Sequence, residues 1–154
     1  MPAMVKPIPD HLRTVTPRLA VPGGDAIDFY SRAFGAEQVG DVFSRPEGEL
    51  IHVEIRIGDS VVMLTGESEG ARAPGDGPVT AIMATYWEDV DAAWERALAA
   101  GAEVIYPLAD QFYGERGGRV RDPFGHHWML SQVIEDVSRE EMERRAAQMF
   151  DSAG

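Results

Sequence analysis

Two landmarks recur at the same separation along this chain, and they constrain its fold more than any other feature. The tripeptide Gly-Ala-Glu occurs at residues 35–37 and again at residues 101–103, which is 66 residues later. The sequence VVML ends at Leu64 and HWML ends at Leu130, and these residues are also 66 apart. Two independent landmarks at one offset indicate an internal duplication with a unit of about 65 residues. Two copies are too few for a solenoid, so we expect a duplicated globular fold.

Each copy contains the pattern of one strand, one helix and three further strands. Residues 14–21 are rich in Thr, Val and Leu, as is typical of a strand, and Asp25 can cap the helix that follows. Apolar side chains then recur at helical spacing up to Gly35, which suits a helix end because glycine adopts the left-handed conformation without steric cost. Gly58-Asp59 predicts a tight hairpin turn between the last two strands. The three later strands are expected over residues 37–43, 50–57 and 60–65.

The second copy repeats this order of elements. Its helix is expected over residues 89–100, with Gly101 as its end. Residues 122–125, Asp-Pro-Phe-Gly, form the turn before the last strand. The four strands of this copy are expected over residues 79–86, 103–107, 118–121 and 126–133.

Short segments flank and join the two copies. Glycine and proline are frequent between the copies, which indicates a linker or a mobile flap. After the second copy, Ser138 and Glu141 fit a capping box at the start of an amphipathic helix. The sequence therefore predicts one domain made of an N-terminal tail (1–13), a first module (14–65), a linker (66–78), a second module (79–133) and a C-terminal helix (134–150).

The composition and charge exclude several classes of function. The chain of 154 residues has no cysteine, which excludes a disulfide scaffold, a thiolate zinc site and a cysteine nucleophile. Its formal net charge of −12 disfavours nucleic-acid binding, because basic groups must replace the counterions of the phosphates. The apolar runs are too short to span a membrane, and the N-terminus lacks the pattern of a secretion signal. We therefore expect a cytoplasmic protein that binds neither nucleic acid nor membrane.

The end of the second copy resembles a known family. The sequence DPFGHHWML at residues 122–130, together with the paired β-α-β-β-β units, resembles the vicinal oxygen chelate superfamily. This superfamily includes glyoxalase I, bleomycin-resistance proteins, fosfomycin-resistance enzymes and extradiol dioxygenases. The stretch GERGGRVRDPFGHHW and the later IEDVSREEMERR helix look most like its PhnB-like branch. The resemblance covers residues 14–133 and implies an α+β fold, in which two modules form a curved mixed sheet around a cavity, usually within a homodimer.

The resemblance also implies positions for one divalent metal ion, held by His, Gln or Glu on the first and last strands of each module. In this chain the last-strand positions carry Met63 and Met129, and the first-strand positions fall near Thr16 and Ile82. None of these side chains is a useful ligand for a hard or borderline divalent cation. We therefore expect no metal at the usual site, no cofactor, and none of the usual metal-bound enediolate or dioxygen chemistry.

Three polar side chains on the expected strands could still carry chemistry. His52 and Glu54 are two residues apart on one strand and so share a face, as a base with its orienting carboxylate, as ligands of a relocated metal, or as an exposed polar surface. We favour the exposed surface for Glu54. For His52 we give equal weight to a functional role and to an exposed surface. His127 shares a strand face with Met129 and is expected to contact a ligand, or to act as an acid or base. A metal bound by His52, Glu54 and His127 requires a convergence that the sequence does not show.

Residues 111–119, QFYGERGGR, form the loop most typical of a functional segment. Arg116 can bind a carboxylate or phosphate in bidentate fashion, Tyr113 adds a ring with a hydroxyl group, and Gln111 adds an amide. In the alternative interpretation the segment is a hairpin whose Arg116 pairs with one of the many acidic residues. Loops over a rigid sheet often carry binding groups, so we favour binding. Tyr86 precedes Trp87 at a strand end, where only one of the two side chains can face inward.

Three functions remain compatible with these residues. The first is a metal-free protein that binds a flat or apolar small organic molecule in a cavity lined by methionine and aromatic side chains, with antibiotic sequestration or resistance as its specific version. The second is a lyase, isomerase or transferase that uses a histidine, the Tyr113 and Arg116 loop, or a relocated metal. The third is a structural or regulatory domain whose own side chains fill the cavity. We favour the first, as a homodimer with a small-molecule ligand. The candidate ligand-binding residues are His52, Glu54, Met63, Ile82, Tyr86, Gln111, Tyr113, Arg116, His127 and Met129.

Overall fold

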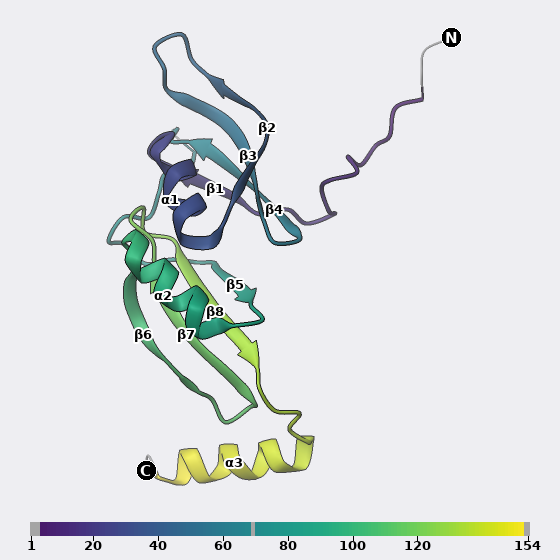
Figure 1. Ribbon diagram of the computed structural model, residues 1–154, viewed down its shortest axis with the longest axis vertical. Helices are drawn as coiled ribbons and strands as arrows, with labels where there is room; N and C mark the ends of the chain where they lie inside the picture. Colours follow the sequence, from purple (N-terminus) through teal and green to yellow (C-terminus); the bar gives the residue numbers. More distant parts are fainter. Residues whose placement is uncertain (1–3, 69, 153–154) are drawn as a thin grey trace. The chain divides into compact units, whose positions relative to one another are not determined.

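The duplicated β-α-β-β-β order is present in the three-dimensional structure. The computed structural model describes residues 4–68 and 70–152, and the chain divides into two compact units, residues 1–73 and residues 74–154. Each unit contains one four-stranded mixed sheet and one helix, and the second unit also carries a C-terminal helix (Figure 1). The predicted α+β class is therefore confirmed.

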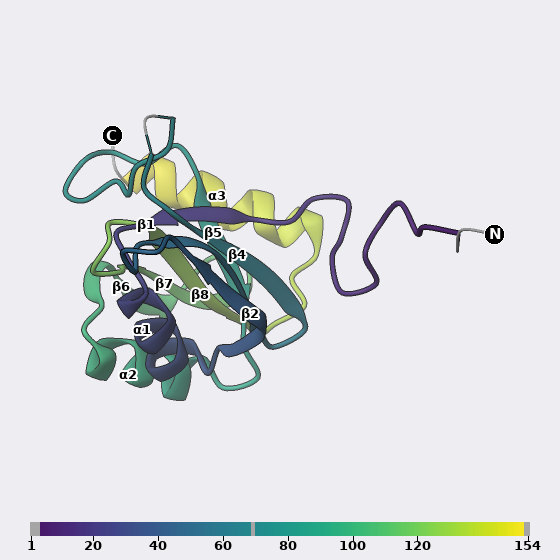
Figure 2. The same cartoon turned by 90° about the horizontal axis from the view of Figure 1, so that it is seen from above.

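The first unit places its first strand beside its last. Its elements are β1 (Arg18–Val21), α1 (Asp25–Phe34), β2 (Glu37–Ser44), β3 (Leu50–Ile57) and β4 (Ser60–Gly66). The strand order is β1-β4-β3-β2, in which β1 runs parallel to β4 and the other neighbours are antiparallel. The helix α1 lies on one side of these strands (Figure 2).

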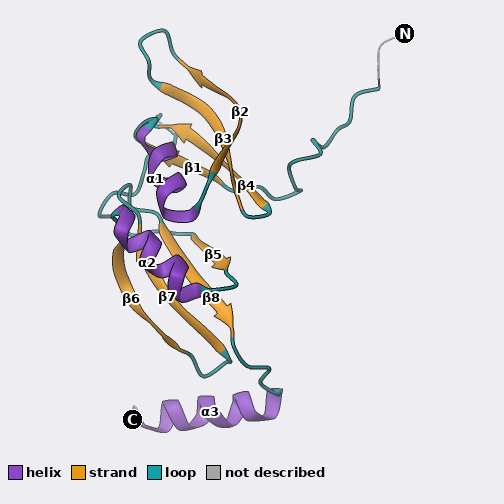
Figure 3. Cartoon of the chain, viewed as in Figure 1, coloured by secondary structure: helices purple, strands orange, loops and turns teal. Residues whose placement is uncertain are grey.

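The second unit repeats this topology. Its elements are β5 (Ile82–Tyr86), α2 (Val90–Ala100), β6 (Glu103–Asp110), β7 (Glu115–Arg121), β8 (His127–Val133) and the C-terminal helix α3 (Arg139–Ser152). The strand order is β5-β8-β7-β6, with β5 parallel to β8 and the other neighbours antiparallel (Figure 3). In each unit the first and last strands are thus parallel neighbours, and two further strands extend the sheet in antiparallel order.

The helices end where glycine was expected to end them. Gly35 and Gly101 both adopt positive φ angles, of 70° and 117°, and their backbone N–H groups donate to carbonyls of the last helical turn. At the start of α2, Asp89 is the N-cap, and its Oδ1 accepts a hydrogen bond from the backbone N–H of Ala92 at 3.1 Å. Asp25 does not have the predicted capping role, because α1 begins at this residue itself and its N-cap is a glycine that has no side chain to accept a bond. The carboxylate of Asp25 still lies in the positively polarised first turn.

Alternate strand residues form the core of each unit. In the first unit Leu19, Val53, Ile55 and Leu64 are buried, and α1 contributes its own buried apolar face, which includes Phe29. In the second unit the buried strand residues are Val120, Trp128 and Leu130, and α2 contributes Trp94 and Ala97. This period of two on the strands and 3.6 on the helices is the amphipathic pattern that made both elements predictable.

Two strands begin three or four residues later than predicted, and one begins three residues earlier. The strand predicted from residue 14 starts at Arg18, directly after Pro17, a residue that has no backbone N–H to donate to a ladder. The strand predicted from residue 79 likewise starts at Ile82. In contrast, β7 starts at Glu115 rather than at residue 118, because a tight turn closes the hairpin: the N–H of Gln111 donates to the carbonyl of Glu115 at 2.7 Å. Most of the predicted functional loop is therefore strand.

The turns between the two central strands differ in length between the units. In the first unit Ile57 pairs with Ser60, so that Gly58 and Asp59 alone form the turn. In the second unit the last pair of the ladder is Arg121 with His127, and residues 122–126 lie between them. The longer turn shifts the register of β7 against β8 by one residue relative to the constant repeat of the sequence.

Asp122 stabilises the longer turn. Its side chain is buried, and Oδ1 accepts hydrogen bonds from the backbone N–H groups of Phe124 and His126 at 2.9 and 3.0 Å. Its other oxygen, Oδ2, accepts from the indole Nε1–H of Trp128 at 2.9 Å. One carboxylate thus satisfies three donors, two in the turn and one in the core beneath it.

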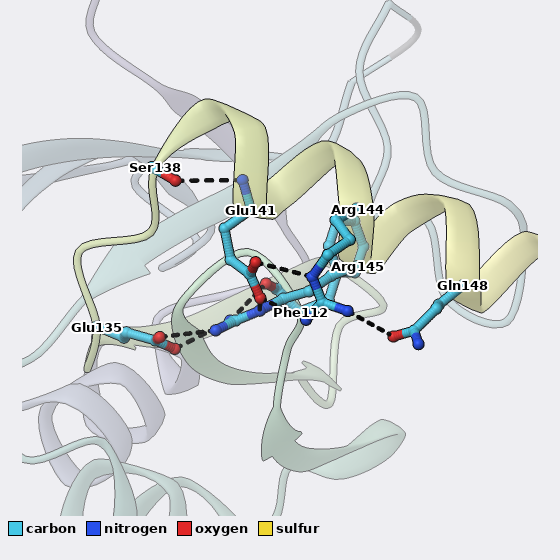
Figure 4. A network of polar contacts seen from close by, with 7 residues as sticks. All are labelled: Phe112, Glu135, Ser138, Glu141, Arg144, Arg145 and Gln148. Atoms are coloured by element: carbon cyan, nitrogen blue, oxygen red, sulfur yellow. Dashed lines mark hydrogen bonds and ion pairs between the residues drawn. The ribbon is translucent and has the colours of Figure 1, made fainter.

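The C-terminal helix is attached to the second unit through Arg145 (Figure 4). Its guanidinium donates to both oxygens of Glu135, at 2.8 and 3.0 Å, to Glu141 at 2.9 Å, and to the backbone carbonyl of Phe112 at 3.2 Å. Ser138 caps the helix, since its Oγ accepts from the N–H of Glu141 at 3.1 Å. The Glu141 carboxylate binds Arg144 and Arg145, which lower its pKa to about 2.

Candidate functional site

Each sheet has one face packed with core residues and one face that carries polar and methionine side chains. We call the second of these the open face. In the first unit a row of paired residues crosses the open face from Arg18 to Met63 to Glu54. In the second unit the corresponding row runs from Ala84 to Met129 to Arg119. The two methionines occupy equivalent central positions, as the repeat predicted.

A carboxylate between two histidines dominates the open face of the first unit. Nε2 of His11 lies 2.6 Å from Oε1 of Glu54, and Nε2 of His52 lies 3.2 Å from Oε2. Burial raises the pKa of Glu54, but the hydrogen bonds and charges of the two imidazoles outweigh burial, so the net shift is downward. The Glu54 side chain is only 17% exposed, which agrees with a structured group rather than the exposed polar surface we favoured for it. This arrangement can hold an imidazole in one orientation for acid–base chemistry.

His11 was not among the predicted site residues. It belongs to the segment expected to be an N-terminal tail, and it reaches Glu54 across 43 residues of sequence. No local pattern marks it, since a single histidine before the first strand has no periodic partner. Only the three-dimensional structure brings it next to the His52 and Glu54 pair.

The open face of the second unit is built around an arginine. The guanidinium carbon of Arg119 lies 5.0 Å from the ring centroid of Tyr106, a cation–π arrangement between paired residues of β7 and β6. On β8, His127 lies two residues before Met129 and so shares its face. Nε of Arg119 and Nδ1 of His127 are shielded from solvent and have no hydrogen-bond partner among the described residues. Burial and then the positive charges of Arg119 and Arg121 lower the pKa of His127.

The positions that would hold the metal of the resembled superfamily do not fit a divalent cation. Met63 and Met129 offer thioethers, and the first-strand residues directly beside them are Arg18 and Ala84. Thr16 precedes β1 and hydrogen-bonds to backbone groups of its own segment, through Oγ1. A cation, a hydrocarbon and two soft sulfur atoms cannot replace the oxygen and imidazole ligands that such an ion requires. Across residues 4–68 and 70–152, no group of three or more His, Asp or Glu side chains is placed to hold a metal ion.

Arg116 faces α2 rather than the open face of its own sheet. Its guanidinium donates to both oxygens of Asp91 on α2, at 2.9 and 3.1 Å, and to Asp110 at 3.1 Å. These carboxylates raise the pKa of Arg116, and Arg116 lowers the pKa of Asp91. The alternative interpretation, a hairpin arginine paired with acidic residues, therefore describes its contacts, and Arg116 joins β7 to the helix that covers the other face.

Two further predicted binding residues, Gln111 and Tyr113, lie in the β6–β7 hairpin, and Tyr86 lies at the end of the edge strand β5. Gln111 donates from Nε2 to the backbone carbonyls of Ala109 and Gly117, both at 3.2 Å, so its amide closes the β6–β7 hairpin. The ring of Tyr113 packs edge-on against its neighbour Phe112. Tyr86 is 65% exposed at the end of β5, and its hydrogen bond to Glu115 raises its pKa.

The structure sorts the candidates into groups. His52, Glu54 and Met63 share the open face of the first unit. His127 and Met129 share that of the second, where Ile82 pairs with His127. Gln111, Tyr113 and Arg116 lie at the β6–β7 hairpin of the second unit. His11, Tyr106 and Arg119 complete the open faces and were not predicted as site residues.

Comparisons with known proteins agree on one family and one fold. The model of the Glyoxalase/Bleomycin resistance protein/Dioxygenase superfamily matches residues 19–130. The chain is 42% identical over 138 residues to the uncharacterized protein Mb0911c of Mycobacterium bovis, which covers 84% of this chain and 89% of that protein. TioX from Micromonospora sp. ML1 has a similar structure, with a TM-score of 0.60 and 28% identity over 82% of this chain and 100% of that one. The PhnB protein of Bacillus cereus shares the fold, with a TM-score of 0.58 and 20% identity over 78% and 98% of the chains.

Proposed function

The chain belongs to the Glyoxalase/Bleomycin resistance protein/Dioxygenase superfamily, and we propose that it binds a small organic molecule without the superfamily's usual metal ion. The observation that carries this proposal is the matched pair of methionines. Met63 and Met129 take the same place in the two units, each at the centre of a row of open-face residues. Thioethers are adaptable apolar contacts and poor ligands for a borderline cation, so both positions favour an organic ligand over a metal ion.

The polar groups around the methionines would orient such a ligand. Binding sites for small molecules combine apolar contacts with a few well-placed polar groups. The open face of the first unit supplies a carboxylate at Glu54 and an imidazole at His52, and that of the second unit supplies a guanidinium at Arg119 and an imidazole at His127. Hydroxyl groups of Thr65 and Ser131 lie in the next row of each sheet. Each open face thus offers apolar contact beside a charged group and an imidazole, which suits a ligand with apolar surface and a polar substituent.

The specific version of the proposal is sequestration of an antibiotic. Bleomycin resistance gives the matched superfamily part of its name. Sequestration needs affinity and no reacting group, which agrees with open faces that lack the superfamily's metal ligands. We also propose that the functional form is a homodimer, as the family resemblance implies. Light scattering on the purified protein at several concentrations measures the assembly directly.

Thermal-shift screening tests the proposal. The purified chain is heated with divalent metals and with a panel of small molecules that includes antibiotics, and mass spectrometry under native conditions identifies anything that co-purifies. We expect an organic compound to raise the melting temperature, because a ligand bound only to the folded state stabilises it by mass action. We expect Zn²⁺, Ni²⁺ and Mn²⁺ to have no such effect. Stoichiometric metal in protein purified without chelators would overturn the proposal.

A double variant at the two methionines tests their role in binding, and a surface variant serves as its matched control. The double variant M63E/M129E restores carboxylates at the two equivalent positions, and Met149→Glu adds a carboxylate to the exposed surface of α3. We expect the double variant to lose the organic ligand, because carboxylates replace the apolar contacts, and the surface variant to retain it. Retention of ligand by M63E/M129E would show that the methionines do not line the site.

A second candidate function is supported by the contacts of Glu54. A carboxylate that holds an imidazole at 3.2 Å is the arrangement of a general base with its orienting group, and His11 adds a second imidazole at 2.6 Å. In this alternative the chain is a lyase, isomerase or transferase, and His52 moves a proton. A reaction that continues unchanged in His52→Gln would remove this alternative.

A further inference from the structure

Three arginines lie on β7, and two of them are paired with acidic residues. Arg116 binds Asp91 and Asp110, and Arg121 binds Glu103 and contacts Asp76 at 3.9 Å. The third, Arg119, forms no ion pair within the parts of the chain that the structure describes. The chain has 26 acidic and 14 basic residues, so acidic partners are abundant. Among the described residues Arg119 has no acidic partner, although the arginines before and after it on β7 each have two. It is therefore available for a negative charge from a bound molecule.

The surroundings of Arg119 leave a donor unused. Its guanidinium lies over the ring of Tyr106, which fixes its plane, and its Nε–H is shielded from water yet has no acceptor. An N–H shielded in this way lowers stability until an acceptor is supplied. A planar guanidinium presents paired N–H groups whose geometry matches the two oxygens of a carboxylate. The arrangement is therefore ready for an oxyanion.

A second unused polar atom lies on the same face. Nδ1 of His127 has no partner, and His127 lies diagonally across the β7–β8 ladder from Arg119. The charged groups that act on this imidazole are Arg119 and Arg121 on β7, with Asp122 and His126 in the turn. The positive charges of the two arginines outweigh the negative charge of Asp122 at this imidazole. An anion bound here would find one guanidinium and one further hydrogen-bonding nitrogen on adjacent strands.

We propose that Arg119 anchors a carboxylate group of the small organic ligand on the open face of the second unit, with Tyr106 beneath it and His127 beside it. This inference rests on the proposed small-molecule function and adds the chemical class of the ligand. The open face of the first unit differs, because it already carries a carboxylate, Glu54, between two imidazoles. The anchor uses the second unit because the shielded Nε–H of Arg119 has no acceptor among the described residues.

Benzoate and benzamide separate the charge from the ring of such a ligand. Both have the same ring, but only benzoate carries the carboxylate. We expect benzoate to shift the Nε–H resonance of Arg119 and the ring resonances of His127 in NMR titrations, and benzamide to bind at least about tenfold more weakly. Benzoate should also raise the pKa of His127 measured by NMR, because the bound anion offsets the charges of Arg119 and Arg121.

Variants test the residue itself. Arg119→Gln removes the charge, Arg119→Lys keeps it without the planar fork, and Arg96→Gln makes the same charge change on the exposed surface of α2. We expect Arg119→Gln to weaken benzoate binding about tenfold, Arg119→Lys to weaken it less, and Arg96→Gln to leave it unchanged. A dispersed amide spectrum confirms that each variant is folded, and Arg119→Lys keeps the test valid if Arg119→Gln is not.

Several results would overturn this inference. They are equal binding of benzoate by wild type and Arg119→Gln, equal binding of benzoate and benzamide, and the absence of any benzoate-induced shift at Arg119. Inorganic phosphate binding at Arg119 more tightly than benzoate would replace the carboxylate with a phosphate group and so overturn it as stated. If benzamide or another neutral compound binds while benzoate does not, the small-molecule function stands and the carboxylate anchor fails.

Discussion

The two open faces lie on sheets with equivalent strand order, but a carboxylate is prominent on one and a guanidinium on the other. The first is centred on Glu54, a carboxylate held by two imidazoles. The second is centred on Arg119, a guanidinium stacked on Tyr106 with no carboxylate partner among the described residues. The buried faces of the same sheets are both apolar, and both central rows keep a methionine. The two units therefore share an apolar core and a central methionine, and they differ at the neighbouring polar positions.

Turn length explains part of this divergence. At a constant offset of 66 residues, Glu54 corresponds to Val120, but Val120 is fully buried on the helix side. The longer β7–β8 turn shifts the ladder by one residue, so Arg119 pairs with Met129 where Glu54 pairs with Met63. A one-residue shift moves every side chain of a strand to the other face. Substitutions at Asp122, Glu54, Arg145 and His127 test how far the two units differ, in decreasing order of the expected effect.

Asp122→Ala should destabilise the longer turn far more than a matched change in the shorter one. The substitution leaves three donors without their acceptor, one of them the buried Nε1–H of Trp128. We expect a loss of about 2–4 kcal/mol in the free energy of unfolding. The exposed Asp59→Ala, in the two-residue turn of the first unit, should change it by less than about 0.5 kcal/mol. Urea unfolding followed by far-UV circular dichroism measures both units, and tryptophan fluorescence reports on the second unit, because Trp87, Trp94 and Trp128 all lie there. Equal losses in both variants would contradict the role given to Asp122.

Glu54→Gln should weaken the first unit in a pH-dependent way. The pKa of Glu54 in the folded chain lies below its ordinary value of 4.5, so its stabilising effect is complete above that value and disappears as the pH falls through the folded pKa. We expect a loss on the order of 1 kcal/mol near neutral pH that shrinks below pH 4.5. Hydrogen exchange of the β3 and β4 amides at several pH values measures this difference. Glu49→Gln, on the exposed loop before β3, is the control and should show no such pH dependence.

Arg145→Gln should loosen α3, an element that only the second unit has. The change removes hydrogen bonds to two carboxylates and to the backbone carbonyl of Phe112. Because partly exposed ion pairs contribute little individually, we expect amide exchange in α3 to accelerate by a few-fold only. Arg139→Gln breaks an exposed pair within the helix and should have less effect. Unchanged protection of α3 in Arg145→Gln would show that apolar contacts alone hold the helix.

His127→Gln should change the acid sensitivity of the second unit, by the smallest amount of the four. The pKa of His127 is lower in the folded chain than its ordinary value of 6.5, so the unfolded chain binds more protons between the two values. Wild-type stability should therefore decline as the pH falls through 6.5, and the variant should lack this part of the decline. Urea unfolding between pH 5 and pH 8 gives the two curves. Parallel curves would mean that the imidazole titrates normally.

The elements were predictable wherever local physics decides the structure. Gly35 and Gly101 end helices through their left-handed backbone, and alternating burial marks residues 50–57 as β3. The start of β7 was not predictable, because its glycines resemble those of a loop. They are there for packing: a Cβ at Gly118 would lie 2.7 Å from the ring of Trp94, and one at Gly117 would lie 2.8 Å from Oγ of Ser131.

The site was predictable only in part, because partners distant in sequence decide it. His52, Glu54, Met63, His127 and Met129 follow from strand periodicity. The sequence does not show that His11 contacts Glu54 or that Asp91 forms an ion pair with Arg116. It also does not show that the longer turn places Arg119 on the open face.

The length of a hairpin turn has a consequence for how the two halves of such a protein can evolve. Point substitutions on a strand replace one side chain at a time, whereas one extra residue in residues 122–126 exchanges the entire set that β7 displays. A register shifted back by one residue would bring Val120 to the open face and Arg119 towards Trp94. The register of this hairpin therefore lets β3 and β7 present different polar side chains above cores of the same kind.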